Sequence, residues 1–292
     1  MDFILVNRKM KHYLSLVKFS HTIFALPFAL IGYFLATQTT NDFNWNTLFF
    51  VILCMLFARN SAMAFNRYVD RKIDEANDRT AKVREIPNGT IKPISALYFV
   101  IINVVLFVAT TYFINPLCFY LSPVAILVVL GYSYTKRFTA LCHLVLGVGL
   151  GLAPIGAYLA VTGNFAWLPL FFSFAVLFWV SGFDIIYALQ DEIFDKQQQL
   201  HSIPVWLGKK RALGLSSFLH IISAFFLIGA GFYANFGIYY WIGTLFFILL
   251  LIYQHLLVKP TDLSKVNLAF FTTNGIASLV FATFVIIDLF FS

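Results

Sequence analysis

Apolar residues fill nine long stretches of this chain, each close to the roughly 20 residues that a helix needs to span a bilayer. Short segments rich in charged residues, Asn, Gly or Pro separate these stretches. The pattern predicts an all-α, polytopic membrane protein in which residues 1–292 form one transmembrane domain. The nine predicted helices cover residues 17–37, 46–66, 94–114, 116–134, 141–162, 165–189, 212–234, 236–258 and 267–290.

The composition supports this reading and excludes a soluble domain. Hydrophobic residues make up 60% of the chain, 35 residues are Phe, and the mean hydropathy is +0.83. A soluble domain of this length cannot bury that much apolar surface in one core.

The basic residues predict the orientation in the membrane. Of the 20 Lys and Arg, all but Arg59 lie in the N-terminal arm or after the second, fourth, sixth or eighth predicted helix. The positive-inside rule therefore places the N-terminus and these loops in the cytoplasm, in a membrane of the bacterial inner-membrane type. The net charge of +7 follows from this asymmetry. It requires no nucleic-acid partner, because basic loops beside a membrane bind anionic lipid headgroups.

A polar cluster interrupts the pattern where the second predicted helix ends, in the sequence NRYVDRKIDE. Asn66, Asp70 and Asp74 follow one another at intervals of four residues. On a helix this spacing places the three side chains on one face, one turn apart. We call these three residues the first ladder.

A second cluster follows the sixth predicted helix, in the sequence FDIIYALQDEIFDK. Its carboxylates, Asp184, Asp191 and Asp195, are spaced to stay near one helical face, and we call them the second ladder. An ordinary solvated helix end explains either ladder alone. Two ladders on one side of the membrane favour a functional cavity, because each ionisable group in a span costs about 3 kcal/mol. Carboxylate and amide oxygens suit Mg²⁺.

Basic residues near the ladders supply partners for a phosphate. Arg79 and Arg84 follow the first ladder, and Lys136 and Arg137 follow the fourth predicted helix. Cations that lie together with Mg²⁺ at the opening of a cavity would bind a pyrophosphate. The positive-inside bias is the alternative explanation for these basic residues.

Both ladders match the two Asp-rich motifs of the UbiA superfamily of intramembrane aromatic prenyltransferases, which the chain resembles almost from end to end. The segments VKFSHTIFALPFAL, RTAKVREIPNG, YSYTKR and HSIPVWLG resemble the 4-hydroxybenzoate polyprenyltransferase branch. The resemblance implies helices around a central cavity that opens to the cytoplasm. It also implies Mg²⁺-dependent transfer of a polyprenyl group from an allylic diphosphate to an aromatic acceptor in ubiquinone or menaquinone biosynthesis. The expected acceptor is 4-hydroxybenzoate.

The resemblance also assigns roles to the residues. Asn66, Asp70 and Asp74 would serve one Mg²⁺, and Asp191 and Asp195 the other. The leaving diphosphate would be neutralised by Arg79, Arg84, Lys136 and Arg137.

Three further residues have two readings each. Tyr187 is a candidate to face the allylic cation, although most aromatic rings in such a chain only pack. Asp184 is a candidate base for the acceptor's proton, or it orients Lys136 or Arg137. Arg59, inside a predicted span, is a candidate to bind the acceptor carboxylate with Asn66 near the phenol, or it forms a structural ion pair with Asp184.

Other polar residues and glycines are expected to have structural roles and no catalytic role. Four glycines in LGVGLGLAPIGAY suit close helix packing, namely Gly147, Gly149, Gly151 and Gly156. His21 and His143 each stand alone near a helix end and are expected to be structural.

Two alternatives to the expected function remain open. The first is the same fold with a different acceptor, a dihydroxynaphthoate or haem. A divalent-cation transporter would also need carboxylates, but it should carry polar groups through the far half of the membrane.

Overall fold

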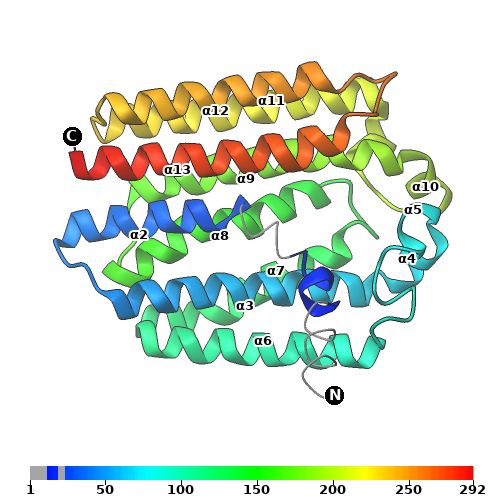
Figure 1. Ribbon diagram of the computed structural model, residues 1–292, viewed down its shortest axis with the longest axis horizontal. Helices are drawn as coiled ribbons and strands as arrows, with labels where there is room; N and C mark the ends of the chain where they lie inside the picture. Colours follow the sequence, from blue (N-terminus) through cyan, green and yellow to red (C-terminus); the bar gives the residue numbers. More distant parts are fainter. Residues whose placement is uncertain (1–11, 19–23, 292) are drawn as a thin grey trace, which may run out of the picture.

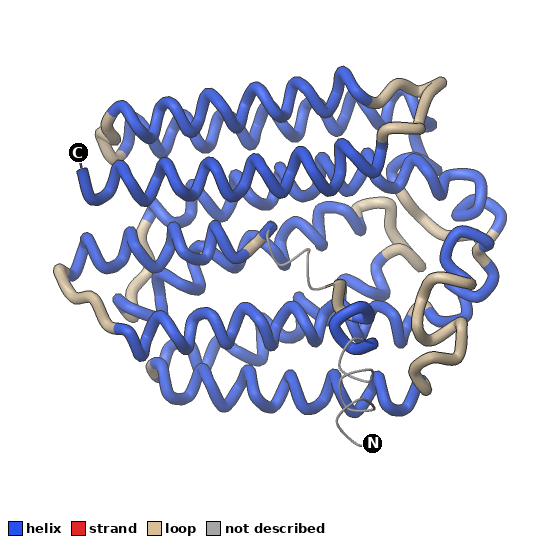
Figure 2. Tube along the Cα trace, in the orientation of Figure 1, coloured by secondary structure: helices blue, strands red, loops and turns tan. Residues whose placement is uncertain are grey.

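The computed structural model describes residues 12–18 and 24–291, whose long helices run side by side along the long axis of the molecule (Figure 1). Helices account for most of the described chain, and loops gather mainly at the two ends of the bundle (Figure 2). The long helices are α2 (Leu26–Thr40), α3 (Trp45–Val69), α6 (Pro93–Ile114), α7 (Pro116–Thr135), α8 (Cys142–Thr162), α9 (Trp167–Ala188), α11 (Ile203–Tyr233), α12 (Ile238–Leu257) and α13 (Asn274–Phe291). The short elements are α4 (Arg71–Ala76), α5 (Asp78–Ala81), η2 (Leu189–Asp191), α10 (Glu192–Gln197) and the π-helix η3 (Leu268–Thr273).

Within the described residues, eight helices are long and apolar enough to cross a membrane, so the chain is an integral membrane protein, as predicted. The first predicted span corresponds to α2, whose 15 described residues begin at Leu26. Residues 19–23, and with them His21, lie outside the described chain.

The predicted ends of the other spans agree with the structure to within three residues, except at the start of α11, provided that η3 and α13 are taken together as one span, Leu268–Phe291. This helix begins at Ile203 and not at residue 212, because Ser202 caps it by accepting a hydrogen bond from the Val205 amide and Pro204 lies in its first turn. The element is kinked at Gly208, whose φ of 72° and ψ of 161° are not helical, and the basic residues 209–211 begin the longer helical part beyond this kink.

Small residues let α8 approach α9 closely, but only on one face. A Cβ atom added at Gly147 would lie 2.3 Å from the Leu177 carbonyl oxygen, and one at Gly151 would lie 2.9 Å from the Ser173 carbonyl oxygen. The prediction of close packing is therefore confirmed at these two positions. It is wrong for Gly149 and Gly156, where an added Cβ would meet nothing within 4 Å because these residues face a cavity.

Polar side chains inside the bundle join helices that are distant in sequence. The Trp179 indole N–H donates to Oδ1 of Asn274 over 2.9 Å, which ties α9 to α13. The Asp288 carboxylate of α13 accepts hydrogen bonds from the backbone amides of Gly237 and Tyr240 and thereby caps α12. These bonds satisfy groups that lipid cannot satisfy.

We expect Gly147→Ala to lower the stability of the protein by about 1–3 kcal/mol, because the new methyl group overlaps the α9 backbone. Thermal unfolding of the purified protein in detergent measures the effect. Gly149→Ala is the matched control in the same helix and should leave the midpoint unchanged. Equal midpoints for both variants would contradict the packing described for α8 and α9.

Candidate active site

The first ladder crosses the junction between α3 and α4. Asp70 lies between the two helices, yet its amide donates to the Asn66 carbonyl over 2.9 Å and the Asp74 amide donates to the Asp70 carbonyl over 2.8 Å. The Asn66 side-chain amide also donates to Oδ2 of Asp70 over 3.1 Å. The helical spacing predicted for these residues is thus kept, although one continuous helix does not carry all three.

Three of the four predicted diphosphate-binding cations contact this ladder. Asp70 is buried and pairs with Lys136 Nζ at 2.5 Å and with Arg137 Nη2 at 2.9 Å, both from the end of α7. Asp74 pairs with Arg84. Oδ2 of Asp74 is buried and, within the described chain, accepts no hydrogen bond.

The second ladder divides where α9 ends. The turn η2 separates α9 from α10, so Asp191 and Asp195 lie beyond the helix that carries Asp184. Asp191 accepts hydrogen bonds from the Asn77 side-chain amide at 3.2 Å and from Nε of Arg79 at 3.1 Å. These bonds join the segment that follows the first ladder to the second ladder, at the end of the bundle that carries α4, α5 and α10 (Figure 1). Asn77 was not predicted as a site residue, because its only signal in the sequence is its position three residues after Asp74.

Arg79 remains charged in this position. Burial works to lower the pKa of its guanidinium, but the hydrogen bonds and charge of Asp191 outweigh burial, so the pKa is raised. Nη1 of Arg79 also donates to the Tyr187 hydroxyl over 3.1 Å, and the guanidinium lies 5.5 Å from the centre of that ring. The other side of Tyr187 packs against Phe270, with ring centres 4.3 Å apart.

Asp184 has a different partner from the one expected. Its Oδ2 lies 2.7 Å from Nδ1 of His143 in α8. The alternative in which Asp184 orients Lys136 or Arg137 is wrong, because both cations bind Asp70. His143, expected to stand alone, was missed as a partner because it lies 41 residues away in sequence.

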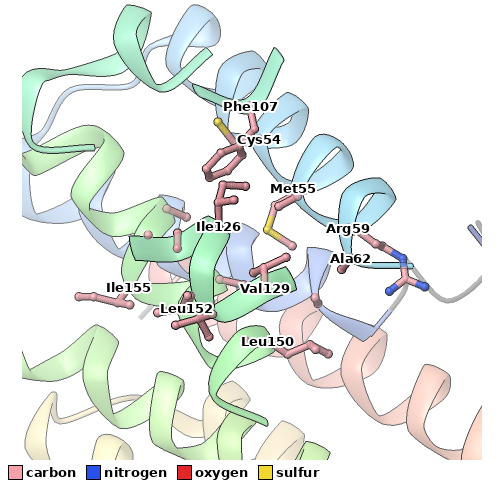
Figure 3. Close-up of a pocket in the computed structure, with 18 of the residues that line it drawn as sticks. Cys54, Met55, Arg59, Ala62, Phe107, Ile126, Val129, Leu150, Leu152 and Ile155 are labelled. Atoms are coloured by element: carbon pink, nitrogen blue, oxygen red, sulfur yellow. The ribbon is translucent and has the colours of Figure 1, made fainter. Parts of the chain in front are cut away.

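Asp184 of the second ladder belongs to the lining of an apolar cavity of about 430 Å³. The cavity lies among α3, α6, α7, α8 and α9, and apolar side chains form most of its wall (Figure 3). Arg59, Tyr132 and Asp184 supply charged or phenolic groups to its lining. Figure 3 shows Arg59 at one end of the labelled residues, away from Cys54 and Phe107.

Arg59 is held by the chain's N-terminal part. Its Nη2 donates to the Lys18 carbonyl over 3.2 Å. The prediction that Arg59 is alone among basic residues inside a span is wrong, because α3 continues to Val69 and includes the buried Arg67. The predicted span ended at residue 66, three residues before the end of α3, and so did not include Arg67.

The donor atoms of the ladders fit Mg²⁺ bound together with a phosphate ligand. Asn66, Asp70, Asp74, Asp191 and Asp195 offer hard oxygen atoms, and the buried Oδ2 of Asp74 lacks a hydrogen bond within the described chain. In the part of the chain that is described, no three His, Cys, Asp or Glu residues are grouped so that they could hold a metal ion by themselves. Mg²⁺ commonly takes one or two carboxylates from a protein, and water and substrate phosphates complete its shell.

These features define a polytopic membrane protein with carboxylates and cations gathered beside an apolar cavity. The chain belongs to the UbiA prenyltransferase family, whose sequence profile matches residues 25–276. It is therefore an enzyme of the prenyltransferase class, as predicted.

Relatives with assigned names share a quarter to a third of their residues with this chain. A 4-hydroxybenzoate octaprenyltransferase from Pasteurella multocida (strain Pm70) is 28% identical over 278 residues, which cover 93% of each chain. One from Aeromonas hydrophila subsp. hydrophila is 29% identical over 247 residues, 83% of each chain.

Solved structures have the same fold. A UbiA homolog from Aeropyrum pernix K1 superposes with a TM-score of 0.83 at 28% identity, covering 92% of this chain and 98% of that one. A UbiA homolog from Archaeoglobus fulgidus, solved with DMAPP and Mg²⁺, has a TM-score of 0.72 at 21% identity, covering 96% of this chain and 99% of that one.

We expect Asp191→Ala to loosen α5, because Asn77, which caps this helix, and Arg79 within it both lose a carboxylate partner. After allowance for the partial exposure of the pair, the loss is about 1 kcal/mol. Amide hydrogen exchange at residues 78–81 should then become about fivefold faster. Asp195→Ala is the control and should not change exchange there. Unchanged exchange in Asp191→Ala would show that the bridge does not hold this segment.

Proposed function

We propose that this enzyme transfers a polyprenyl group from an allylic polyprenyl diphosphate to an aromatic acceptor, 4-hydroxybenzoate, in quinone biosynthesis. The observation that carries the proposal is the junction of an apolar cavity with clustered carboxylates and cations. A prenyl diphosphate has the matching chemistry, since it joins an apolar tail to an anionic head. The names of the curated relatives support 4-hydroxybenzoate as the acceptor and an octaprenyl donor.

The diphosphate is proposed to bind among Arg79, Arg84, Lys136 and Arg137. Each of these cations already contacts a ladder carboxylate or its neighbour, so the diphosphate oxygens would take over part of these contacts. Asn66, Asp70 and Asp74 would hold one Mg²⁺, and Asp191 and Asp195 the other. When bound, Mg²⁺ stabilises the negative charge that develops on the leaving diphosphate.

The acceptor is proposed to bind at the polar part of the cavity. Arg59 belongs to the cavity lining, and its guanidinium would pair with the acceptor carboxylate. Asn66 would lie near the phenol. The ring of Tyr187 would face the allylic cation, and Asp184, which lines the cavity, would accept the proton that the acceptor ring loses.

The membrane arrangement is also part of the proposal. Residues 1–292 would form one transmembrane prenyltransferase domain, with the N-terminus and the ladders on the cytoplasmic side. A divalent-cation transporter is a poorer match, because the cavity wall is mostly apolar away from Arg59, Tyr132 and Asp184.

The metal sites can be tested by removing one ligand from each ladder. Asp70→Asn and Asp191→Asn should each lower kcat by about 10²–10³-fold, because charge on the leaving group is less well stabilised. EDTA should abolish activity, and added Mg²⁺ should restore it. Asp42→Asn, in the exposed loop between α2 and α3, is the control. Near-normal, chelator-resistant turnover in either ladder variant would refute the two-metal arrangement.

The acceptor site can be tested at Arg59. Arg59→Ala should weaken 4-hydroxybenzoate binding by about 2–4 kcal/mol and leave the KM for the prenyl diphosphate unchanged. Arg59→Lys should restore binding only in part, because an ammonium group cannot make the planar, two-pronged contact of a guanidinium. The measurement is initial-rate kinetics with a panel of aromatic acceptors. An unchanged acceptor KM, or a wild-type preference for acceptors without a carboxylate, would rule out 4-hydroxybenzoate.

A further inference from the structure

His143 is held on both ring nitrogens by groups from other helices. Its Nδ1 lies 2.7 Å from Oδ2 of Asp184 in α9, and its Nε2 lies 3.3 Å from the backbone nitrogen of Ile203, at the start of α11. The His143 carbonyl also accepts a hydrogen bond from the Ser181 hydroxyl, over 3.2 Å. The ring is buried and has little freedom to reorient.

These contacts assign the position of the ring proton. A backbone amide can only donate, so Nε2 of His143 must accept the hydrogen bond from Ile203 and cannot carry a proton. The proton of the neutral ring is therefore on Nδ1 and is donated to Asp184. The first turn of α11 thus sets the tautomer of His143, in the same way that outer partners orient the histidines of other sites.

The hydrogen bond leaves the two oxygen atoms of Asp184 unequal. Oδ2 is committed to His143, whereas within the described chain no hydrogen bond reaches Oδ1. The side chain is 23% exposed and belongs to the cavity lining, together with Arg59 and Tyr132. His143 thereby holds a carboxylate at the cavity with one oxygen available to a substrate.

We infer that His143 is a positioning residue for prenyl transfer, which fixes Asp184 so that its Oδ1 can accept the acceptor's ring proton. This inference rests on the proposed function. In that reaction the C–O bond of the allylic diphosphate breaks, and its electron pair leaves with the diphosphate. A ring electron pair forms the new C–C bond. The ring C–H bond then breaks, its electrons restore the aromatic ring, and the proton goes to Asp184.

A set of variants in the full-length protein tests the inference. His143→Leu should lower kcat about 10–100-fold, as loss of an outer partner does at other sites, with an unchanged KM for the prenyl diphosphate. Combining it with Asp184→Asn should give no further loss beyond Asp184→Asn alone, since His143 acts only through Asp184. Thr162→Ala, at the opposite end of α8 from His143, is the control. Multiplied losses in the double variant would overturn the inference and indicate a general structural role.

Two conservative variants keep the test decisive if His143→Leu folds poorly. The amide N–H of Asn can occupy the place of Nδ1–H, whereas that of Gln reaches the place of Nε2. His143→Asn should therefore recover much of kcat, and His143→Gln should not. Equal kcat values for the Asn and Gln variants would overturn the inference.

The outcomes also separate this inference from the proposed function. If the wild type is inactive with every acceptor, both the proposed function and the positioning role of His143 are overturned. If the wild type transfers the prenyl group, Asp184→Asn is slow and His143→Leu keeps the wild-type kcat, only the positioning role is overturned.

Discussion

A charge inside a bilayer must have a partner, and this constraint organises the whole molecule. An unpaired ionisable group within a span costs about 3 kcal/mol or more, so the buried carboxylates of Asp70 and Asp74 occur with Lys136, Arg137 and Arg84 against them. These pairs connect the end of α3 to the end of α7 and to the segment after α5. The same pairs keep the carboxylates and cations of the candidate site together before any substrate binds.

Regular spacing explains how much could be predicted from the sequence. The spans follow from the length of apolar runs, and the first ladder follows from the four-residue repeat, because both are local properties of a helix. The contact of His143 with Asp184 is not local. It depends on how α8 packs on α9, and so do the different surroundings of Gly147 and Gly149, which lie two residues apart on opposite sides of one helix.

The carboxylate–cation pairs also bear on how a substrate would enter the site. A diphosphate that approaches Arg84 or Lys136 competes with Asp74 or Asp70 for the same N–H donors, and a divalent cation competes with those donors for the carboxylates. Each ligand would thus release the groups that the other needs. Binding of metal and diphosphate would therefore be mutually favourable, as linkage requires when two ligands relieve the same set of internal contacts.

The cavity is not sealed from the surface that faces lipid. Val124, Gly156 and Phe165 belong to its lining, and all three are exposed. An apolar tail in this cavity would pass from lipid to protein without crossing water, so the hydrophobic effect would contribute little to its binding. The supply of such a substrate would depend on its number per area of membrane rather than per volume of cytoplasm. The turnover of this enzyme would then respond to the lipid content and fluidity of the bilayer around it.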